Sequence, residues 1–235
     1  MWKGLKIFAV VSLGLLASGC ATRNDAVGSI TPYENPAQPA DVASEGLPAR
    51  GPSLPDSSLA VAAPVGFISF CTRFPDQCIA QPDAPSVVTL AAPQWLALEE
   101  INKSVNWAIK PMDDKRHYGR EEYWNIPTDG FGDCEDYALT KRKRLMAAGF
   151  PEPALRLALA LDWRNERHAV LTVSTDRGDF VLDNLTDEIS SANKSDYEWI
   201  ERQDPTKQWG WLALGKSPNP VYVASAANGP MGSAP

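Results

Sequence analysis

Cysteine, histidine and aspartate occur in this chain in an order that could support nucleophilic catalysis. Cys134 follows the glycine-rich stretch 130–133, at the point where a helix is expected to begin. The positive end of a helix dipole favours thiolate over thiol, and the thiolate is the nucleophile. His168 and Asp183 follow in two strand-like runs and would act as base and orienter, although Asn184 could take the second role. We therefore predict a catalytic set of Cys134, His168 and Asp183.

Each of these residues also has a plainer explanation. A single buried cysteine commonly behaves as a small apolar residue, and an aspartate can simply begin a turn. A histidine at the start of a strand is more often structural than catalytic. The combination of all three residue types, with Cys134 at a helix start, favours catalysis. The only other histidine, His117, lies among charged residues and is expected to be exposed.

Three carboxylates flank the predicted nucleophile: Asp133, Glu135 and Asp136. Negative charge raises the pKa of a thiol and so opposes thiolate formation. Two explanations for these acids stay open. Acidic residues favour the first turn of a helix, where they cap its amino end. Alternatively, they bind a calcium ion, whose charge would reverse the local electrostatics.

The surrounding sequence predicts an α+β domain in which helices precede antiparallel strands. Apolar residues recur at helical spacing over 91–109 and 134–148, and Gly149 is a natural helix stop. Strands are expected at 155–161 and on either side of the hairpin signal 175–178. A turn of about four residues would place His168 opposite Asp183, whereas a tighter turn would offset them.

The amino terminus has the pattern of an export signal over residues 1–20. Lys3 and Lys6 precede a short apolar run, and the segment ending at Cys20 resembles the lipobox of bacterial lipoproteins. Lipidation at Cys20 would anchor the protein to a membrane; ordinary signal cleavage near Ala21 is the alternative. We expect a periplasmic location in either case.

The remaining cysteines and the net charge agree with export. Cys71 and Cys78 are spaced for a short-loop disulfide, and the alternative of a metal site is weaker because no histidine is near. Cys134 is then left without a partner. The net charge is −7 and becomes −9 when Lys3 and Lys6 are removed with the signal, so nucleic-acid binding is not expected.

Composition divides the rest of the chain into three parts. Residues 21–62 are rich in Pro, Ala and Ser and are expected to form a disordered tether. Residues 63–214 are long enough for one compact domain. Residues 215–235 have the composition of a flexible tail.

Four segments share a pattern with a known family: Tyr123-Trp124-Asn125-Ile126-Pro127, Gly132-Asp133-Cys134-Glu135-Asp136-Tyr137-Ala138, His168-Ala169-Val170-Leu171 and Val181-Leu182-Asp183-Asn184-Leu185. Over about residues 65–212 the chain resembles the bacterial transglutaminase-like cysteine peptidases, which include the LapG-type periplasmic proteases. This resemblance implies a papain/transglutaminase-like fold and the Cys134, His168, Asp183 triad. It also implies calcium dependence, with Asp133 and Glu135 as the calcium-linked pair and Asp136 as a further candidate ligand.

The resemblance also implies a biological role. Better-studied members of the family cut the periplasmic amino-terminal region that retains large surface adhesins, and they thereby release cells from a biofilm. An inner-membrane receptor for cyclic-di-GMP sequesters the protease. The lipid anchor and tether expected here are not typical of those soluble members.

Two other classes of function stay open. The same triad could cleave cell-wall peptides as an amidase or transfer amides as a transglutaminase does, because a fold and a triad do not determine the acceptor. A third hypothesis is a non-enzymatic, calcium-dependent interaction module.

Overall fold

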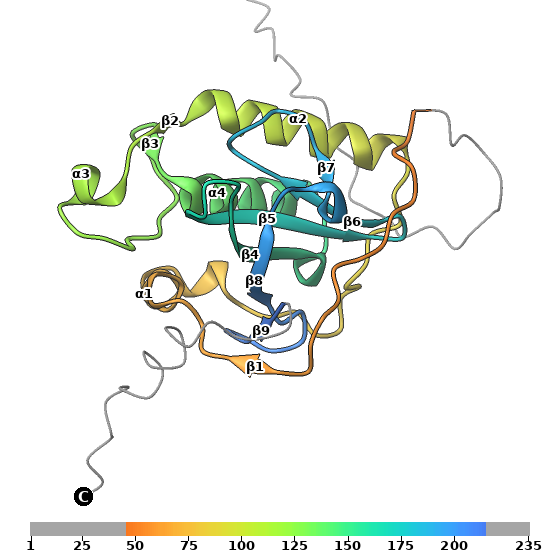
Figure 1. Cartoon of the computed structure of the whole chain (residues 1–235), viewed down its shortest axis with the longest axis horizontal. Coiled ribbons are helices and arrows are strands. Elements are labelled where there is room, and N and C mark those ends of the chain that lie inside the picture. Colours follow the sequence, from red (N-terminus) through yellow and green to blue (C-terminus); the bar gives the residue numbers. More distant parts are fainter. Residues whose placement is uncertain (1–45, 215–235) are drawn as a thin grey trace, which may run out of the picture. The chain divides into compact units, whose positions relative to one another are not determined.

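The computed structural model describes residues 46–214 of the chain, which form an α+β domain (Figure 1). Its main sheet has seven strands in the order β1-β9-β8-β4-β5-β6-β7, and each neighbouring pair is antiparallel. The strands are β1 (Ala60–Val61), β4 (Leu155–Leu161), β5 (Arg167–Thr175), β6 (Gly178–Leu182), β7 (Ser190–Ser191), β8 (Glu198–Gln203) and β9 (Trp211–Ala213).

Four α-helices accompany this sheet in the described part of the chain: α1 (Val65–Arg73), α2 (Ala92–Ala108), α3 (Asp114–Tyr118) and α4 (Cys134–Ala147). Short 3-10 turns occupy η1 (Pro75–Gln77), η2 (Glu152–Ala154) and η3 (Ala192–Lys194). Between α2 and α4 the chain makes an excursion that carries α3 and ends in a small parallel pair, β2 (Lys110–Pro111) with β3 (Phe131–Gly132). In Figure 1 this excursion projects to one side of α4.

The two faces of the sheet pack against different partners because side chains alternate along a strand. On β4, Leu157 and Leu159 belong to the main core with Leu98 of α2 and Leu145 of α4. Ala158 between them faces the other side, in a smaller apolar cluster. The first of these clusters fixes α4 against β5, which places the start of α4 next to the sheet.

The helix limits agree closely with the sequence pattern. Pro93 lies in the first turn of α2, where its missing N–H costs no hydrogen bond. At the far end of α4, Gly149 has a φ of 89° and donates its N–H to the Met146 carbonyl at 3.0 Å. A glycine tolerates this left-handed conformation, so the helix stops there.

The hairpin between β5 and β6 resolves the register that the sequence left open. Thr175 pairs with Gly178 and Leu171 pairs with Leu182, which leaves a two-residue turn. Continued along the strands, this register would place residue 185 opposite His168, so Asp183 is offset by two positions. The tighter of the two predicted turns is therefore the one that forms.

The expected tether at 21–62 does not reach residue 62. Residues 60–61 form β1, an edge strand paired with β9, and Leu54 is buried with 8% of its surface exposed. Asp56 forms ion pairs with Arg156 and Arg202, which are buried in the sheet. A Pro/Ala/Ser-rich composition suggested disorder, but these few side chains hold the segment on the sheet.

Cys71 and Cys78 are joined by a disulfide with a Cα–Cα distance of 5.6 Å. The predicted export signal, Cys20, the tether before residue 46 and the tail 215–235 lie outside the described residues. Among the helices of residues 46–214, none is long and apolar enough to cross a membrane.

Candidate active site

The start of α4 is shaped by two glycines and the β2–β3 pair. Gly130 has a φ of 81°, and its carbonyl accepts the Lys110 N–H at 2.8 Å. A Cβ at Gly132 would lie 2.6 Å from Asp136 Oδ2, so only glycine fits. These constraints turn the chain so that Cys134 is the first residue of the helix.

The Cys134 thiol has two polar neighbours. Its Sγ lies 3.4 Å from the backbone nitrogen of Ala169 on β5 and 3.1 Å from Glu135 Oε2. Burial raises the pKa of the thiol well above its ordinary value, and the negative charge of Glu135 raises it further. It is the free cysteine among the described residues. In this arrangement the thiol is protonated and donates to the Glu135 carboxyl group.

His168 and Asp183 are in direct contact despite the offset in register. His168 Nε2 lies 2.9 Å from Asp183 Oδ1, and both side chains are buried. Burial alone would raise the pKa of Asp183, but hydrogen bonds and the charge of His168 lower it below its ordinary value. Because Nε2–H donates to a carboxylate, Nδ1 is the ring nitrogen left to accept a proton.

The residues around this pair include one that the sequence did not suggest. The Tyr197 hydroxyl donates to Asp183 Oδ2, and its ring centroid lies 5.6 Å from that of His168. Asn184, the alternative orienter, has a buried Oδ1 without a partner, whereas the imidazole contacts Asp183. No periodicity or motif marks Tyr197, because its position depends on how the chain crosses from β7, at one edge of the sheet, to β8, which pairs with β4.

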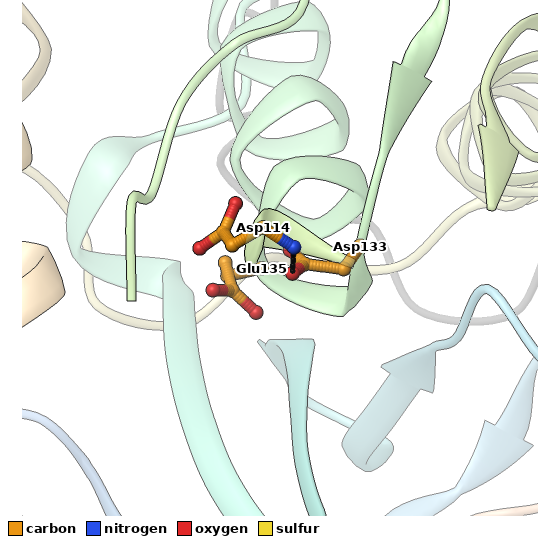
Figure 2. Close-up of side chains that lie close together, drawn as sticks. All are labelled: Asp114, Asp133 and Glu135. Atoms are coloured by element: carbon orange, nitrogen blue, oxygen red, sulfur yellow. Dashed lines mark hydrogen bonds between the residues drawn. The ribbon is translucent and has the colours of Figure 1, made fainter. Parts of the chain in front are cut away.

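An acidic cluster lies beside the thiol and consists of Asp114, Asp133 and Glu135 (Figure 2). One carboxylate oxygen from each lies within 4.8 Å of the others. Burial and the charge of Asp114 raise the pKa of Asp133 to about 6. Burial, followed by the charge of Asp133, raises the pKa of Glu135 well above its ordinary value.

The donor set of this cluster fits a hard cation. Asp114 Oδ1 and Asp133 Oδ1 are buried without a hydrogen-bond partner, and carboxylate oxygens are the ligands that calcium prefers. Asp133 does not cap α4 with its side chain; its Oδ2 accepts the Asp114 N–H at 3.2 Å instead. Capping therefore does not explain Asp133, although Glu135 and Asp136 do lie in the first turn.

Asp136 was expected among the calcium ligands but lies outside the acidic cluster. Its Oδ1 accepts the Asn125 N–H at 2.7 Å, and burial raises its pKa to about 8. The third carboxylate of the cluster is that of Asp114. The Asp113-Asp114 pair was visible in the sequence, but nothing local indicated that α3 would return to the start of α4. His117 is also more buried than expected: it stacks on Tyr118.

A thiol at a helix start beside a His–Asp pair on an antiparallel sheet defines the class of protein: an α+β domain with the elements of a cysteine peptidase. The profile of the bacterial transglutaminase-like cysteine proteinases matches residues 58–219, more than half of the chain. The chain belongs to this family and is therefore a cysteine peptidase with a transglutaminase-like fold.

Solved structures of LapG from Legionella pneumophila are similar to this chain. The calcium-bound form is 26% identical, with a TM-score of 0.44, over 57% of this chain and 78% of that one. An EGTA-treated form is 29% identical, with a TM-score of 0.45, over 53% and 68%. A further LapG structure is 30% identical, with a TM-score of 0.44, over 52% and 70%. No curated protein matches the chain.

Proposed function

We propose that this cysteine peptidase is a calcium-dependent endopeptidase with Cys134 as nucleophile, His168 as base and Asp183 as orienter. One observation carries the assignment. Cys134 Sγ contacts the backbone nitrogen of Ala169, the residue next to His168, while His168 is bonded to Asp183. The thiol at the start of α4 thus lies against the strand that carries His168, and the His168 side chain contacts Asp183 just after β6.

The proposed reaction is acyl transfer to water. His168 Nδ1 takes the proton of the Cys134 thiol, and Sγ bonds to the carbonyl carbon of the scissile peptide. The C–N bond then breaks as the imidazolium gives its proton to the leaving amine. Water, losing a proton to His168, hydrolyses the thioester and regenerates the thiol. Backbone N–H groups at the start of α4 are suited to stabilise the oxyanion.

The acidic cluster supports the calcium dependence. Asp114, Asp133 and Glu135 would hold the ion, whose positive charge would offset the negative charge beside the thiol. Without such an offset, burial and Glu135 keep the pKa of Cys134 high. The carboxylates that raise the pKa of Cys134 would therefore also bind the ion that lowers it.

The proposed substrate is the periplasmic amino-terminal retention region of a large surface adhesin, so that cleavage controls biofilm attachment. The resemblance of the four active-site segments to LapG-type proteases supports this substrate class. Export to the periplasm, an anchor at Cys20 and regulation by an inner-membrane cyclic-di-GMP receptor belong to the same proposal.

The test is cleavage of a purified amino-terminal region of a large repeat adhesin from the same genome. We expect one discrete cut in calcium, none in EGTA, and a loss of about 10³-fold or more in Cys134→Ala. Alkylation of Cys134 by iodoacetamide, followed by mass spectrometry, should be faster in calcium than in EGTA. Equal alkylation under both conditions would contradict the role proposed for the ion.

The remaining outcomes separate the other classes of function. Cleavage of muropeptides in place of the adhesin region would indicate a cell-wall peptide amidase. Transfer of an added amine to a glutamine substrate would indicate a transglutaminase-type enzyme. Calcium-dependent binding of the adhesin region without any cut would indicate an interaction module.

A further inference from the structure

The main chain that carries Asp183 is tied to helix α2 by an asparagine. β6 ends at Leu182, so Asp183 begins the connection to β7. Asn106 Nδ2 lies 2.9 Å from the Asp183 carbonyl oxygen, 3.0 Å from the Thr186 carbonyl oxygen and 3.0 Å from Asp187 Oδ1. The two hydrogens of one amide are thus shared among three acceptors, all of them in residues 183–187.

Two neighbours on α2 extend this contact. Asn102, one helical turn before Asn106, donates to the Asp187 carbonyl oxygen at 3.1 Å and is fully buried. The indole Nε1 of Trp107 donates to Asp187 Oδ2 at 2.9 Å. In Figure 1 the connection between β6 and β7 lies against α2. We call Asn102, Asn106 and Trp107 the α2 clamp.

The clamp is linked to the Asp183 carboxylate through the loop itself. Asp183 Oδ1 accepts the Leu185 N–H at 3.0 Å as well as the His168 Nε2–H. An aspartate that bonds to the backbone two residues later fixes its own side chain to the fold of its loop. Any shift of residues 183–187 therefore moves the carboxylate relative to the imidazole.

We propose that the α2 clamp positions Asp183 for catalysis, with Asn106 as its central residue. This inference rests on the proposed role of Asp183 as orienter of His168. The clamp residues do not contact the reacting atoms, so they are positioning residues. Trp107 has 73% of its surface exposed, yet its indole N–H is committed to Asp187. Its main polar contact is thus with the loop that carries Asp183.

The kinetic test compares Asn106→Ala with Glu99→Ala, a matched change at an exposed position of the same helix. A misplaced catalytic group can reduce turnover by up to about 100-fold, so we expect a 10- to 100-fold lower kcat in Asn106→Ala. KM should stay within about twofold, because the hydrogen bonds of the clamp run to residues 183–187 and would affect the position of Asp183 alone. Trp107→Phe removes the indole N–H but keeps an aromatic ring at this exposed position, and it should act in the same direction, less strongly.

A second measurement does not depend on peptidase activity. The sequence has only two histidines, so the imidazole ¹⁵N resonances of His168 can be assigned by their loss in His168→Gln. We expect Asn106→Ala to move the Nε2 resonance toward its position in Asp183→Ala, while Glu99→Ala leaves it in place. An unchanged Nε2 resonance in both Asn106→Ala and Trp107→Phe would overturn the clamp. If the wild type cleaves no peptide, but Asn106→Ala still shifts the His168 Nε2 resonance, the clamp would be upheld and the proposed function refuted.

Discussion

Cys134 is surrounded by groups that keep its thiol protonated. The helix dipole alone would favour thiolate, but burial and the carboxyl group of Glu135 outweigh it and raise the pKa. The thiol donates to Glu135 at 3.1 Å. A cation held by Glu135 and its acidic neighbours would weaken both effects. The electrostatics of this one residue therefore give a physical reason for the proposed calcium dependence.

Lys141 lies two turns after Cys134 on α4, and burial shifts its pKa in the opposite direction. Its side chain is fully buried, and its Nζ has no hydrogen-bond partner. Burial lowers its pKa to about 7, although the charges of Asp183 and Asp187 partly oppose the change. A buried ammonium is costly, and in the folded protein this one loses its proton near neutral pH.

Lys141→Met should remove a pH-dependent destabilisation. Between pH 7 and about 10.5 the unfolded chain binds the lysine proton and the folded chain does not, so the free energy of unfolding rises with pH. The penalty is fully present below pH 7, where we expect the methionine variant to be the more stable. That advantage should shrink by roughly 2–3 kcal/mol between pH 6.5 and pH 9 in urea unfolding. If the free energies of unfolding of the wild type and Lys141→Met changed in parallel with pH, the lowered pKa of Lys141 would be contradicted.

At the scale of elements, residues 54–61 before α1 form a strap that is held on the sheet. Asp56 accepts hydrogen bonds from Arg156 at 2.9 and 3.0 Å and from Arg202 at 2.7 Å. Arg202 also bonds to Asp179 at 2.8 Å and to the Leu54 carbonyl at 3.0 Å. Two arginines buried in β4 and β8 thus depend on a carboxylate that the strap supplies.

Asp56→Asn should detach the strap and leave Arg156 without a charged partner. Breaking a fully buried pair costs about 3–5 kcal/mol, but Asp56 has 40% of its side chain exposed, so we expect a loss of about 2 kcal/mol. Urea unfolding measures this loss in the free energy of unfolding. We also expect a protease to cut the strap faster in the variant. Asp83→Asn, the same change at an exposed residue, should have no effect. Equal stability of the two variants would show that the ion pairs of Asp56 do not stabilise the fold.

The elements that the sequence predicted are those with a local signal. α2 and α4 carry apolar residues at helical spacing, and Gly149 marks the end of α4, so their limits were correct to about one residue. The β5–β6 register and the strap depend on pairings across the sheet, which no local pattern contains. Asp114 was missed for the same reason: its neighbours Asp113 and Lys115 give it the appearance of a solvated charged loop.

At the scale of the whole molecule, the acidic cluster joins parts that are distant in the sequence. Asp114 lies in α3, and its carboxylate accepts the Tyr123 N–H of the following loop. Asp133 and Glu135 belong to the start of α4. Without a cation, these carboxylates repel one another. Binding of an ion would therefore fasten the whole excursion between α2 and α4 to the catalytic helix.

Calcium should consequently stabilise the entire domain, and the ligands should be identifiable from that effect. A ligand present at 100 times its Kd adds about 2.7 kcal/mol, which corresponds to a rise in Tm of roughly 5–10 °C for a domain of this size. We expect this rise between EGTA and calcium in the wild type, and its loss in Asp114→Asn, by thermal unfolding. Asp136→Asn also removes one acidic group beside Glu135, but it should retain the rise, because Asp136 lies outside the cluster. If instead Asp136→Asn lost the rise and Asp114→Asn kept it, Asp136 would be a calcium ligand, as expected from the sequence, and Asp114 would not.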